Sequence, residues 1–256
     1  MCLQCEFAVI DDSEEISSIL EQTKEYYRQR AAQFADWNRG ESDGGSKPDS
    51  SVFEEAKILL DALQAENLKG AILEIASGTG IWTEALAKNA SSVTALDSSP
   101  EMLERCRSRL GADPRVRYVV ADFYDWIPDQ EYDAASFSFW ISHVPSSKLD
   151  KFVSKLSGCL KTGGRIFFVD QQTQEMKHED LVRSGGEVAW RTLDNWKRFR
   201  VFKHFYTPEE IRDSFLAHGI TTKITYTPSH FFYVQGEKIP GSPRSNSKNG
   251  QSRRLT

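Results

Sequence analysis

From residue 71 to residue 170 the sequence alternates short apolar segments with amphipathic ones, and this alternation limits the possible folds more than any other feature. Strands that alternate with helices of this length form βαβ units, which build a parallel sheet with right-handed crossovers. We therefore predict an α/β fold here. The expected strands are residues 71–76, 92–97, 115–122, 132–140 and 163–171, and the expected helices are 81–90, 100–110 and 146–160.

The segments on either side have a different character. Helical spacing of apolar residues appears in 13–38 and 52–67, with a loop rich in Gly and Ser between them. A polar and aromatic insertion interrupts the alternation after Asp170; a helix then starts near Thr207, and two strands joined by a Pro-Ser turn indicate an antiparallel hairpin. We predict three regions: an N-terminal helical cap (1–70), a main domain (71–235) with a lid insertion (171–206), and a disordered tail (236–256).

The composition limits the kinds of partner that the protein is expected to bind. The 256 residues carry a net charge of −5, so nothing indicates binding to nucleic acid. Apolar runs are too short for a membrane span, and the N-terminus lacks the basic start of a secretory signal, so we expect a cytoplasmic protein without a membrane partner. Cys2 and Cys5 form a C-x-x-C pair, but Cys106 and Cys159 stand alone. We expect reduced thiols and no metal.

Open parallel sheets bind ligands at the carboxyl ends of their strands. At the expected strand ends the sequence has the stretch AILEIASGTG (71–80), and further along the chain Asp97, Asp122 and His143. The Gly-Thr-Gly turn lacks the third glycine of a dinucleotide site, where Thr83 stands, and the lysine of a phosphate loop. Glu74 would moreover repel a pyrophosphate. These features favour a nucleoside ligand without phosphate.

Five stretches at these strand ends resemble, in order, the motifs of class I S-adenosylmethionine-dependent methyltransferases. They are LEIASGTG (73–80), Asp-Ser-Ser-Pro-Glu-Met-Leu (97–103), ADFYDW (121–126), FSFWISHVP (137–145) and LKTGGRIFFVD (160–170). The resemblance implies a Rossmann-like class I methyltransferase fold with a seven-stranded, mostly parallel sheet and a C-terminal antiparallel hairpin strand. It also implies S-adenosyl-L-methionine as cofactor.

The resemblance implies roles for individual residues. Gly78 and Gly80 would let the backbone approach the methionine part of the cofactor, Glu74 would hold its amino end, and Asp97 would accept both ribose hydroxyls. Asp122 would accept from the adenine amino group. The expected cofactor-binding set is Glu74, Ala76, Gly78, Gly80, Asp97, Ser98, Met102, Asp122, Phe123 and Phe139. Ala76 stands where the family commonly has glycine. Glu74 as a helix cap or ion-pair partner, and Asp97 as an ordinary helix cap, remain alternatives.

His143 is the best-placed general base, because an imidazole with a pKa near neutrality can deprotonate a hydroxyl. The alternative is that it pins the loop by hydrogen bonds. YYRQRAAQFADW (26–37) resembles an N-terminal segment that closes over the cofactor in small-molecule methyltransferases of the family. The expected acceptor-binding residues are Tyr26, Tyr27, Arg30, Trp140, Trp190 and Trp196. These aromatic residues can equally pack a core helix and a lid.

Absent motifs restrict the acceptor. The segment after the fourth strand lacks the Pro-Pro-Tyr sequence that grips flat amino groups, and it lacks the acidic cluster of metal-dependent catechol enzymes. We predict metal-independent methylation of an oxygen or nitrogen on a small organic molecule, with an aromatic or apolar acceptor favoured. The alternatives are a protein methyltransferase, a non-catalytic cofactor-binding module and an oxidoreductase.

Overall fold

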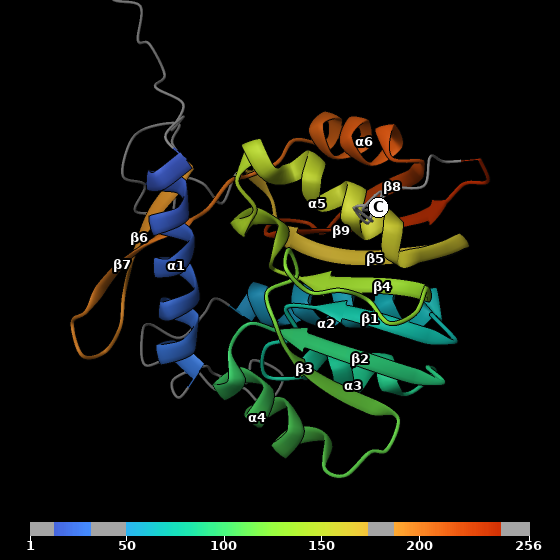
Figure 1. Cartoon of the computed structure of the whole chain (residues 1–256), viewed down its shortest axis with the longest axis horizontal. Helices are drawn as coiled ribbons and strands as arrows, with labels where there is room; N and C mark the ends of the chain where they lie inside the picture. The colour runs from blue at the N-terminus through green and yellow to red at the C-terminus, as the bar shows by residue number, and fades with distance from the viewer. Residues whose placement is uncertain (1–12, 32–49, 174–186, 242–256) are drawn as a thin grey trace, which may run out of the picture.

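A computed structural model describes residues 13–31, 50–173 and 187–241, drawn in colour in Figure 1. Its elements in chain order are α1 (Ser13–Arg30), α2 (Ser50–Glu66), β1 (Ala71–Ile75), α3 (Ile81–Ala87), β2 (Ser92–Asp97), α4 (Pro100–Leu110), β3 (Val116–Val120), β4 (Tyr132–Ser138), the short 3₁₀ helix η3 (Ile141–His143), α5 (Ser146–Cys159), β5 (Leu160–Gln171), β6 (Val188–Thr192), β7 (Arg198–Phe202), α6 (Pro208–Ala217), β8 (Ile220–Tyr226) and β9 (Phe231–Lys238).

Seven strands form one sheet in the order β3-β2-β1-β4-β5-β9-β8. Neighbouring strands from β3 to β5 run parallel, whereas β9 runs antiparallel to both β5 and β8. The predicted fold class is thereby confirmed, including the C-terminal antiparallel hairpin. From β1 the chain proceeds through β2 and β3 toward one edge of the sheet, and then places β4 and β5 on the other side of β1. Such a change of direction opens a crevice beyond the carboxyl ends of β1 and β4.

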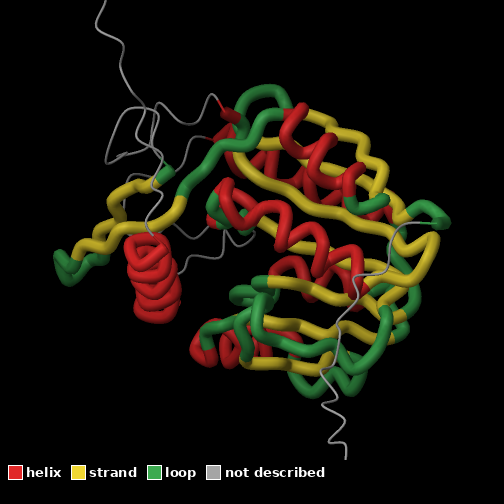
Figure 2. The backbone as a smooth tube through the Cα atoms, turned by 45° about the horizontal axis from the view of Figure 1, so that its top comes forward, coloured by secondary structure: helices red, strands yellow, loops and turns green. Residues whose placement is uncertain are grey.

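Helices cover both faces of the sheet, which gives the three layers visible in Figure 2. Because side chains alternate along a strand, Ile72 and Leu73 of β1 point to opposite faces. Ile72 packs with α2, α3 and α4, and Leu73 packs with α5 and α6. Each is fully buried, which contributes about 1.5–3 kcal/mol per side chain. The fold thus holds the strand ends on a rigid core.

Helix starts are set by local chemistry as the sequence predicts. Before α4, the Oγ of Ser99 accepts the N–H of Met102 at 3.1 Å, and Pro100 occupies the first turn. Before α6, Thr207 and Glu210 form a reciprocal capping box. The first of these caps fixes the direction in which α4 leaves the end of β2, close to the crevice.

The segment after β5 differs from the prediction. Within the expected insertion, residues 188–202 form a two-stranded antiparallel hairpin, β6–β7, that was not predicted. It packs on α1 rather than on the main sheet, through contacts of Tyr26 and Ile19 with apolar residues of the hairpin. Figure 1 shows α1 and this hairpin side by side, beyond one end of the parallel strands.

Two features of the structure bear on the predicted region boundaries. Leu59 and Leu63 of α2 pack on the sheet, so α2 belongs to the core rather than to a separate cap. Strand β9 continues to Lys238, and the predicted tail therefore starts too early. Residues 242–256, as well as Cys2 and Cys5, lie outside the described residues. None of the helices in the described ranges is long and apolar enough to cross a membrane.

Candidate active site

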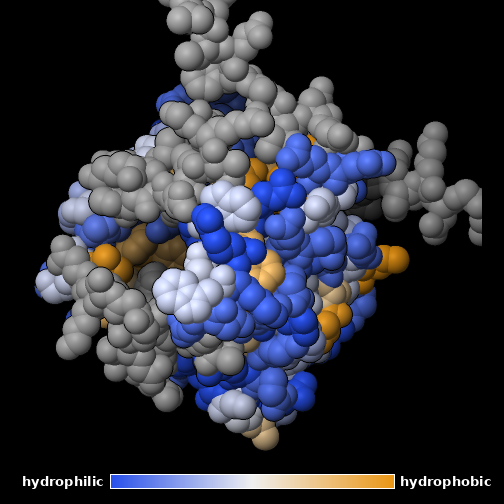
Figure 3. Space-filling model, turned by 90° about the vertical axis from the view of Figure 1, so that its left-hand side faces the viewer, coloured by the Kyte–Doolittle hydropathy of each residue, from blue (hydrophilic) through white to orange (hydrophobic). Residues whose placement is uncertain are grey.

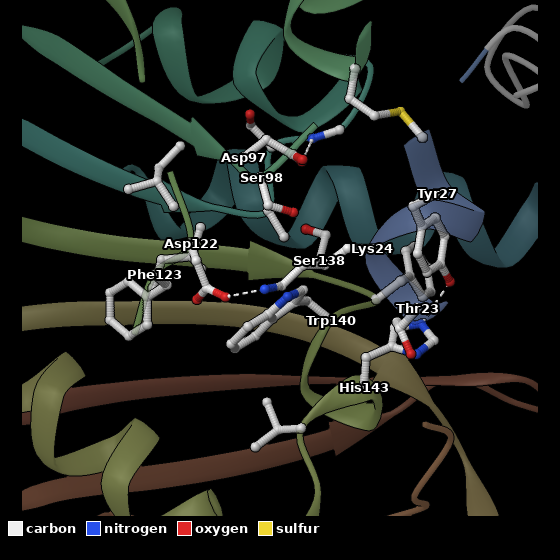
Figure 4. Close-up of a pocket in the computed structure, with 18 of the residues that line it drawn as sticks. Thr23, Lys24, Tyr27, Asp97, Ser98, Asp122, Phe123, Ser138, Trp140 and His143 are labelled. Atoms are coloured by element: carbon white, nitrogen blue, oxygen red, sulfur yellow. Dashed lines mark hydrogen bonds and ion pairs between the residues drawn. The ribbon is translucent and has the colours of Figure 1, made fainter. Parts of the chain in front are cut away.

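One cavity of about 580 Å³ lies at the carboxyl ends of the parallel strands. Gly78, Asp97 and Asp122 line it from the sheet side, and Lys24 and Tyr27 line it from α1. Figure 4 shows these elements converging on it, and Figure 3 shows a hollow with apolar side chains on this side of the molecule. The sheet and α1 therefore form two walls of one site.

The turn after β1 contains three residues with left-handed backbone. Their φ angles are 53° at Ala76, 55° at Gly78 and 86° at Gly80. A Cβ atom on Gly78 would meet nothing within 4 Å, whereas one on Gly80 would lie 2.7 Å from the Sγ of Cys106 in α4. Gly78 thus keeps the cavity wall open, and Gly80 lets α4 pack closely against the turn.

Asp97 ties the turn to the end of β2. Its Oδ2 accepts the N–H of Gly78 at 2.9 Å, and its Oδ1 accepts the N–H of Ser99 at 2.8 Å. Burial raises the pKa of Asp97, against the opposing effect of these backbone donors. A carboxylate oxygen can accept more than one hydrogen bond, so both oxygens can also receive ligand hydroxyls. Ser98 and Met102 line the cavity beside it.

Asp122 is engaged from two sides. Its Oδ1 accepts the N–H of Tyr124 at 2.8 Å, and its Oδ2 lies 2.9 Å from the Nζ of Lys24 on α1. Phe123 and Phe139 line the same cavity. The contact with Lys24 was not predicted. It links the α1 wall of the cavity to the end of β3.

Glu74 is placed differently from the prediction. It is 2% exposed and is absent from the described residues that line the cavity. Alternation along β1 puts it on the face covered by α3 and α4, where its carboxyl group interacts with Thr83. Burial raises the pKa of Glu74 to about 8, and its Oε2 has no hydrogen-bond partner among the described residues. Direct contact with a ligand in the cavity is therefore not supported.

His143 lies between two other segments. Its Nδ1 is 2.5 Å from the carbonyl oxygen of Phe202, which can only accept, so the proton resides on Nδ1. Its Nε2 therefore accepts the hydroxyl of Tyr27, at 2.7 Å. Burial, with the positive charges of Lys203 and Arg191, lowers the pKa of His143 to about 3. The expected pKa near neutrality is wrong, and these hydrogen bonds support the loop-pinning alternative.

The residues predicted to bind the acceptor divide into two groups. Tyr27, Arg30 and Trp140 line the cavity. The other three do not line it among the described residues: Tyr26 is buried between α1 and the hairpin, Trp190 stacks under Arg198, and Trp196 is 87% exposed at the hairpin turn. These are corrections.

The physical reason for the placement of Trp190 is alternation along β6. Arg191 faces the cavity, so its neighbour Trp190 faces the opposite side. There the guanidinium carbon of Arg198 lies 4.6 Å from the centre of the Trp190 ring. The predicted segment is right, but the side chains that reach the cavity from it are different ones.

The lining contains hydroxyl groups that suit a polar ligand. Ser77 Oγ, Ser138 Oγ and Tyr124 Oη are buried and have no hydrogen-bond partner in the described chain. With the Asp97 carboxylate and the open face of Gly78, they fit a ligand that carries both donors and acceptors, as a nucleoside with an amino-acid group does. Among the described ranges, no three His, Cys, Asp or Glu side chains gather as metal ligands. Metal independence stays a prediction.

Comparisons with known proteins agree with this geometry. Residues 72–164 match the family model described as a methyltransferase domain. A demethylmenaquinone methyltransferase of Clavibacter sepedonicus is 39% identical over 123 residues, which is 48% of this chain and 48% of that relative. A ubiquinone biosynthesis O-methyltransferase of Xylella fastidiosa strain M23 is 29% identical over 196 residues, covering 74% of this chain and 76% of the relative.

A solved structure extends the likeness to nearly the whole chain. The DhpI–SAH complex has a TM-score of 0.72 and 31% identity, and the match covers 88% of this chain and 98% of that one. A second structure of that protein, the DhpI–SAM–HEP complex, has a TM-score of 0.71. The chain therefore belongs to the class I S-adenosylmethionine-dependent methyltransferases, and S-adenosylmethionine is its methyl donor.

Proposed function

We propose that this chain transfers a methyl group from S-adenosylmethionine to an oxygen or nitrogen of a small organic molecule. One observation carries the proposal: the residues after β1, β2 and β3 share one cavity with residues of α1, η3 and the β6–β7 hairpin. Its volume of about 580 Å³ falls within the roughly 300–1,000 Å³ typical of small-molecule sites. When bound, the cofactor supplies an electrophilic methyl group on a sulfonium sulfur.

The donor half of the cavity is proposed to lie along the sheet. Gly78 would face the amino-acid part of the cofactor, and Asp97 would accept from the ribose hydroxyls. Met102 and Phe123 would flank the adenine. Asp122 would accept from its amino group, in which case the ammonium of Lys24 must share or release the carboxylate. Glu74 would stabilise the turn after β1 from the face of the sheet that α3 and α4 cover.

His143 is proposed to position other groups rather than to take a proton. Both of its ring nitrogens are committed, one to the Phe202 carbonyl and one to the Tyr27 hydroxyl. It therefore joins α1, η3 and β7 at the wall where the acceptor would sit. Trp140, which immediately precedes η3, lines the cavity with an apolar ring, which supports an acceptor with an aromatic or apolar body.

Calorimetric titration with S-adenosylmethionine tests the donor half. We expect micromolar binding that Asp97→Ala weakens at least about tenfold, or about 1.4 kcal/mol. Asp213→Ala is the matched control, since Asp213 is exposed on α6, away from the cavity lining, and should leave the affinity unchanged. Absence of binding by the native protein contradicts the proposal.

Isotope-labelled cofactor tests the acceptor. After incubation with a cell extract, label in the small-molecule fraction supports the proposal. Label confined to protein favours the protein methyltransferase instead. Cofactor binding without transfer to any fraction favours a non-catalytic module.

A further inference from the structure

We propose that the acceptor is a small organic oxyanion, a carboxylate or a phosphonate, and that its charged oxygen receives the methyl group. This rests on the proposed function and names the substrate class of the same cavity. Two features of the described acceptor end carry it, a gathering of cations and the commitment of His143 and Tyr27 to each other, together with the chemistry of an anionic nucleophile.

The first feature is the charge of the cavity wall around Tyr27 and His143. Arg30, Arg191 and Lys203 come from α1, β6 and the segment after β7, and all three line the cavity. Their charges act on this pair of side chains: Lys203 and Arg191 disfavour a proton on His143, and Arg191 and Arg30 favour ionisation of Tyr27. They therefore lie together at one end.

The acidic residues of the described lining lie elsewhere. Asp97, Asp122 and Asp125 follow β2 and β3 on the donor side, and Glu21 pairs with Lys24, which also contacts Asp122. Lys24, Lys148 and Lys151 also line this donor side, beside Asp122 and Tyr124, so it carries charges of both signs. Around Tyr27 and His143, by contrast, the charged side chains of the described lining are cations. Such a field attracts an anionic substrate to the end at which it would react.

Lys203 is the most deeply placed of these cations, with 4% of its surface exposed. Its Nζ lies 3.0 Å from Ser142 Oγ and 3.9 Å from Asp170 Oδ1. The Asp170 carboxylate already accepts the N–H groups of Ser142 and Gln171, at 3.0 Å and 2.8 Å. The ion pair with Asp170 is long, and the positive charge of the Lys203 ammonium would attract an oxyanion in the cavity.

The second feature is the state of the nearby titratable groups. His143 uses Nε2 to accept from Tyr27, and its pKa of about 3 makes it far too weak to deprotonate a phenol, whose ordinary pKa is about 10. The Tyr27 hydroxyl is itself a donor with a raised pKa. A carboxylate or phosphonate is already ionised at neutral pH and needs no base.

The reaction then balances without a proton. A lone pair of the oxyanion forms the new C–O bond, the C–S bond breaks, and its electron pair stays on the sulfur. The sulfonium becomes a neutral thioether, and the acceptor loses one negative charge as its methyl ester. Arginine holds oxyanions through two parallel N–H bonds, so the guanidinium groups can fix one oxygen while another attacks. The ester carries less charge than the acid and binds the cations less tightly, which favours its release.

The test uses benzoate, phenylphosphonate and phenol, which share one ring and differ in the reacting group. Each is titrated into the full chain in the presence of S-adenosylhomocysteine, and each is incubated with S-adenosylmethionine for mass spectrometry of products. We expect one or both acids to bind and to yield the methyl ester, and the ester formed identifies the preferred oxyanion. Methylation of phenol but of neither acid, or failure of both acids to bind, overturns the inference.

Variants separate this inference from the proposed function. Arg191→Gln and Lys203→Met should each weaken acid binding at least about tenfold while leaving S-adenosylmethionine affinity unchanged, which also shows that they fold. Arg198→Gln is the control on the same hairpin, because Arg198 stacks on Trp190 outside the cavity lining. Acid binding that neither substitution weakens overturns the inference alone. Loss of cofactor binding by the native chain overturns the proposed function instead.

Discussion

The two glycines of the turn after β1 should respond differently to the same substitution. At Gly80, alanine must keep a left-handed backbone, which costs about 1–2 kcal/mol. Its Cβ would also lie 2.7 Å from the Sγ and 3.0 Å from the Cα of Cys106. Because the second contact is with backbone, α4 must move, and overpacking of this kind costs about 1–3 kcal/mol. Gly80→Ala should therefore destabilise the fold by about 2–5 kcal/mol.

At Gly78 the same methyl group meets open space, so only the backbone term of about 1–2 kcal/mol applies. The methyl group would project into the cavity, where the proposed cofactor lies against the turn. Gly78→Ala should therefore fold with a melting temperature only roughly 2–8 °C lower, but lose at least about tenfold in affinity for S-adenosylmethionine.

Thermal unfolding without ligand and calorimetric titration measure the two effects separately. The expected pattern is a large loss of stability in Gly80→Ala, and a small loss of stability with a large loss of affinity in Gly78→Ala. Native affinity in Gly78→Ala would refute the proposal that this turn faces the cofactor. Equal melting temperatures of the two variants would refute the packing argument for Gly80.

Four further outcomes are expected. Ala76→Gly should raise stability by about 1 kcal/mol, seen in urea unfolding, because glycine adopts the φ of 53° without the strain that alanine carries. The pKa of Glu74 is about 8 in the fold against about 4.5 unfolded, so the native state binds more protons between these values. The free energy of unfolding should therefore fall as pH rises from about 4.5 to 8, and the fall should be larger in the native chain than in Glu74→Gln. Parallel pH profiles of the two proteins would contradict this. Tyr27→Phe leaves the His143 Nε2 without its donor and should cost about 1–3 kcal/mol in chemical denaturation; an unchanged midpoint would show that this hydrogen bond does not hold α1. Methyl transfer should continue in excess EDTA, and activity that returns only with a divalent cation would contradict metal independence.

The parallel part of the sheet could be predicted because local and global signals coincide there. Strands β1, β2, β4 and β5 are mostly buried, so they read as short apolar runs, and the helices between them carry apolar stripes. Asp97 is the last residue of β2 and Asp122 lies two residues beyond β3, so the fold brings both to one edge of the sheet whatever the details of packing. For these residues, position along the chain is enough to give position in space.

The direction of Glu74 could also have been derived. It shares a face with Ile72, and alternation along β1 places both beneath α3 and α4 rather than at the cavity. The family resemblance led to the opposite expectation. A strict reading of the two-residue period in the strand would have given the observed placement.

The β6–β7 hairpin and the contacts of α1 could not be predicted as readily. Strand β7 begins with alternating arginine and apolar residues, but β6 shows no such alternation, and both strands are held by packing on α1, a segment distant in the sequence. A turn signal exists at Asp194 and Asn195, between two runs that contain aromatic residues. Nothing local, however, indicates that Lys24 meets Asp122, because that contact depends on where α1 docks.

The docking of the hairpin on α1 has a consequence for how such an enzyme can diversify. The proposed donor residues sit on the buried sheet, while Arg30, Arg191 and Lys203 come from two chain segments that flank it and pack on each other. Exchange of residues 13–31 and 187–206 between relatives as a matched pair would leave the turn after β1 untouched. Substitutions in these two segments can therefore change the preferred acceptor without changing the donor site. Because α1 and the hairpin pack on each other, they are constrained to change together.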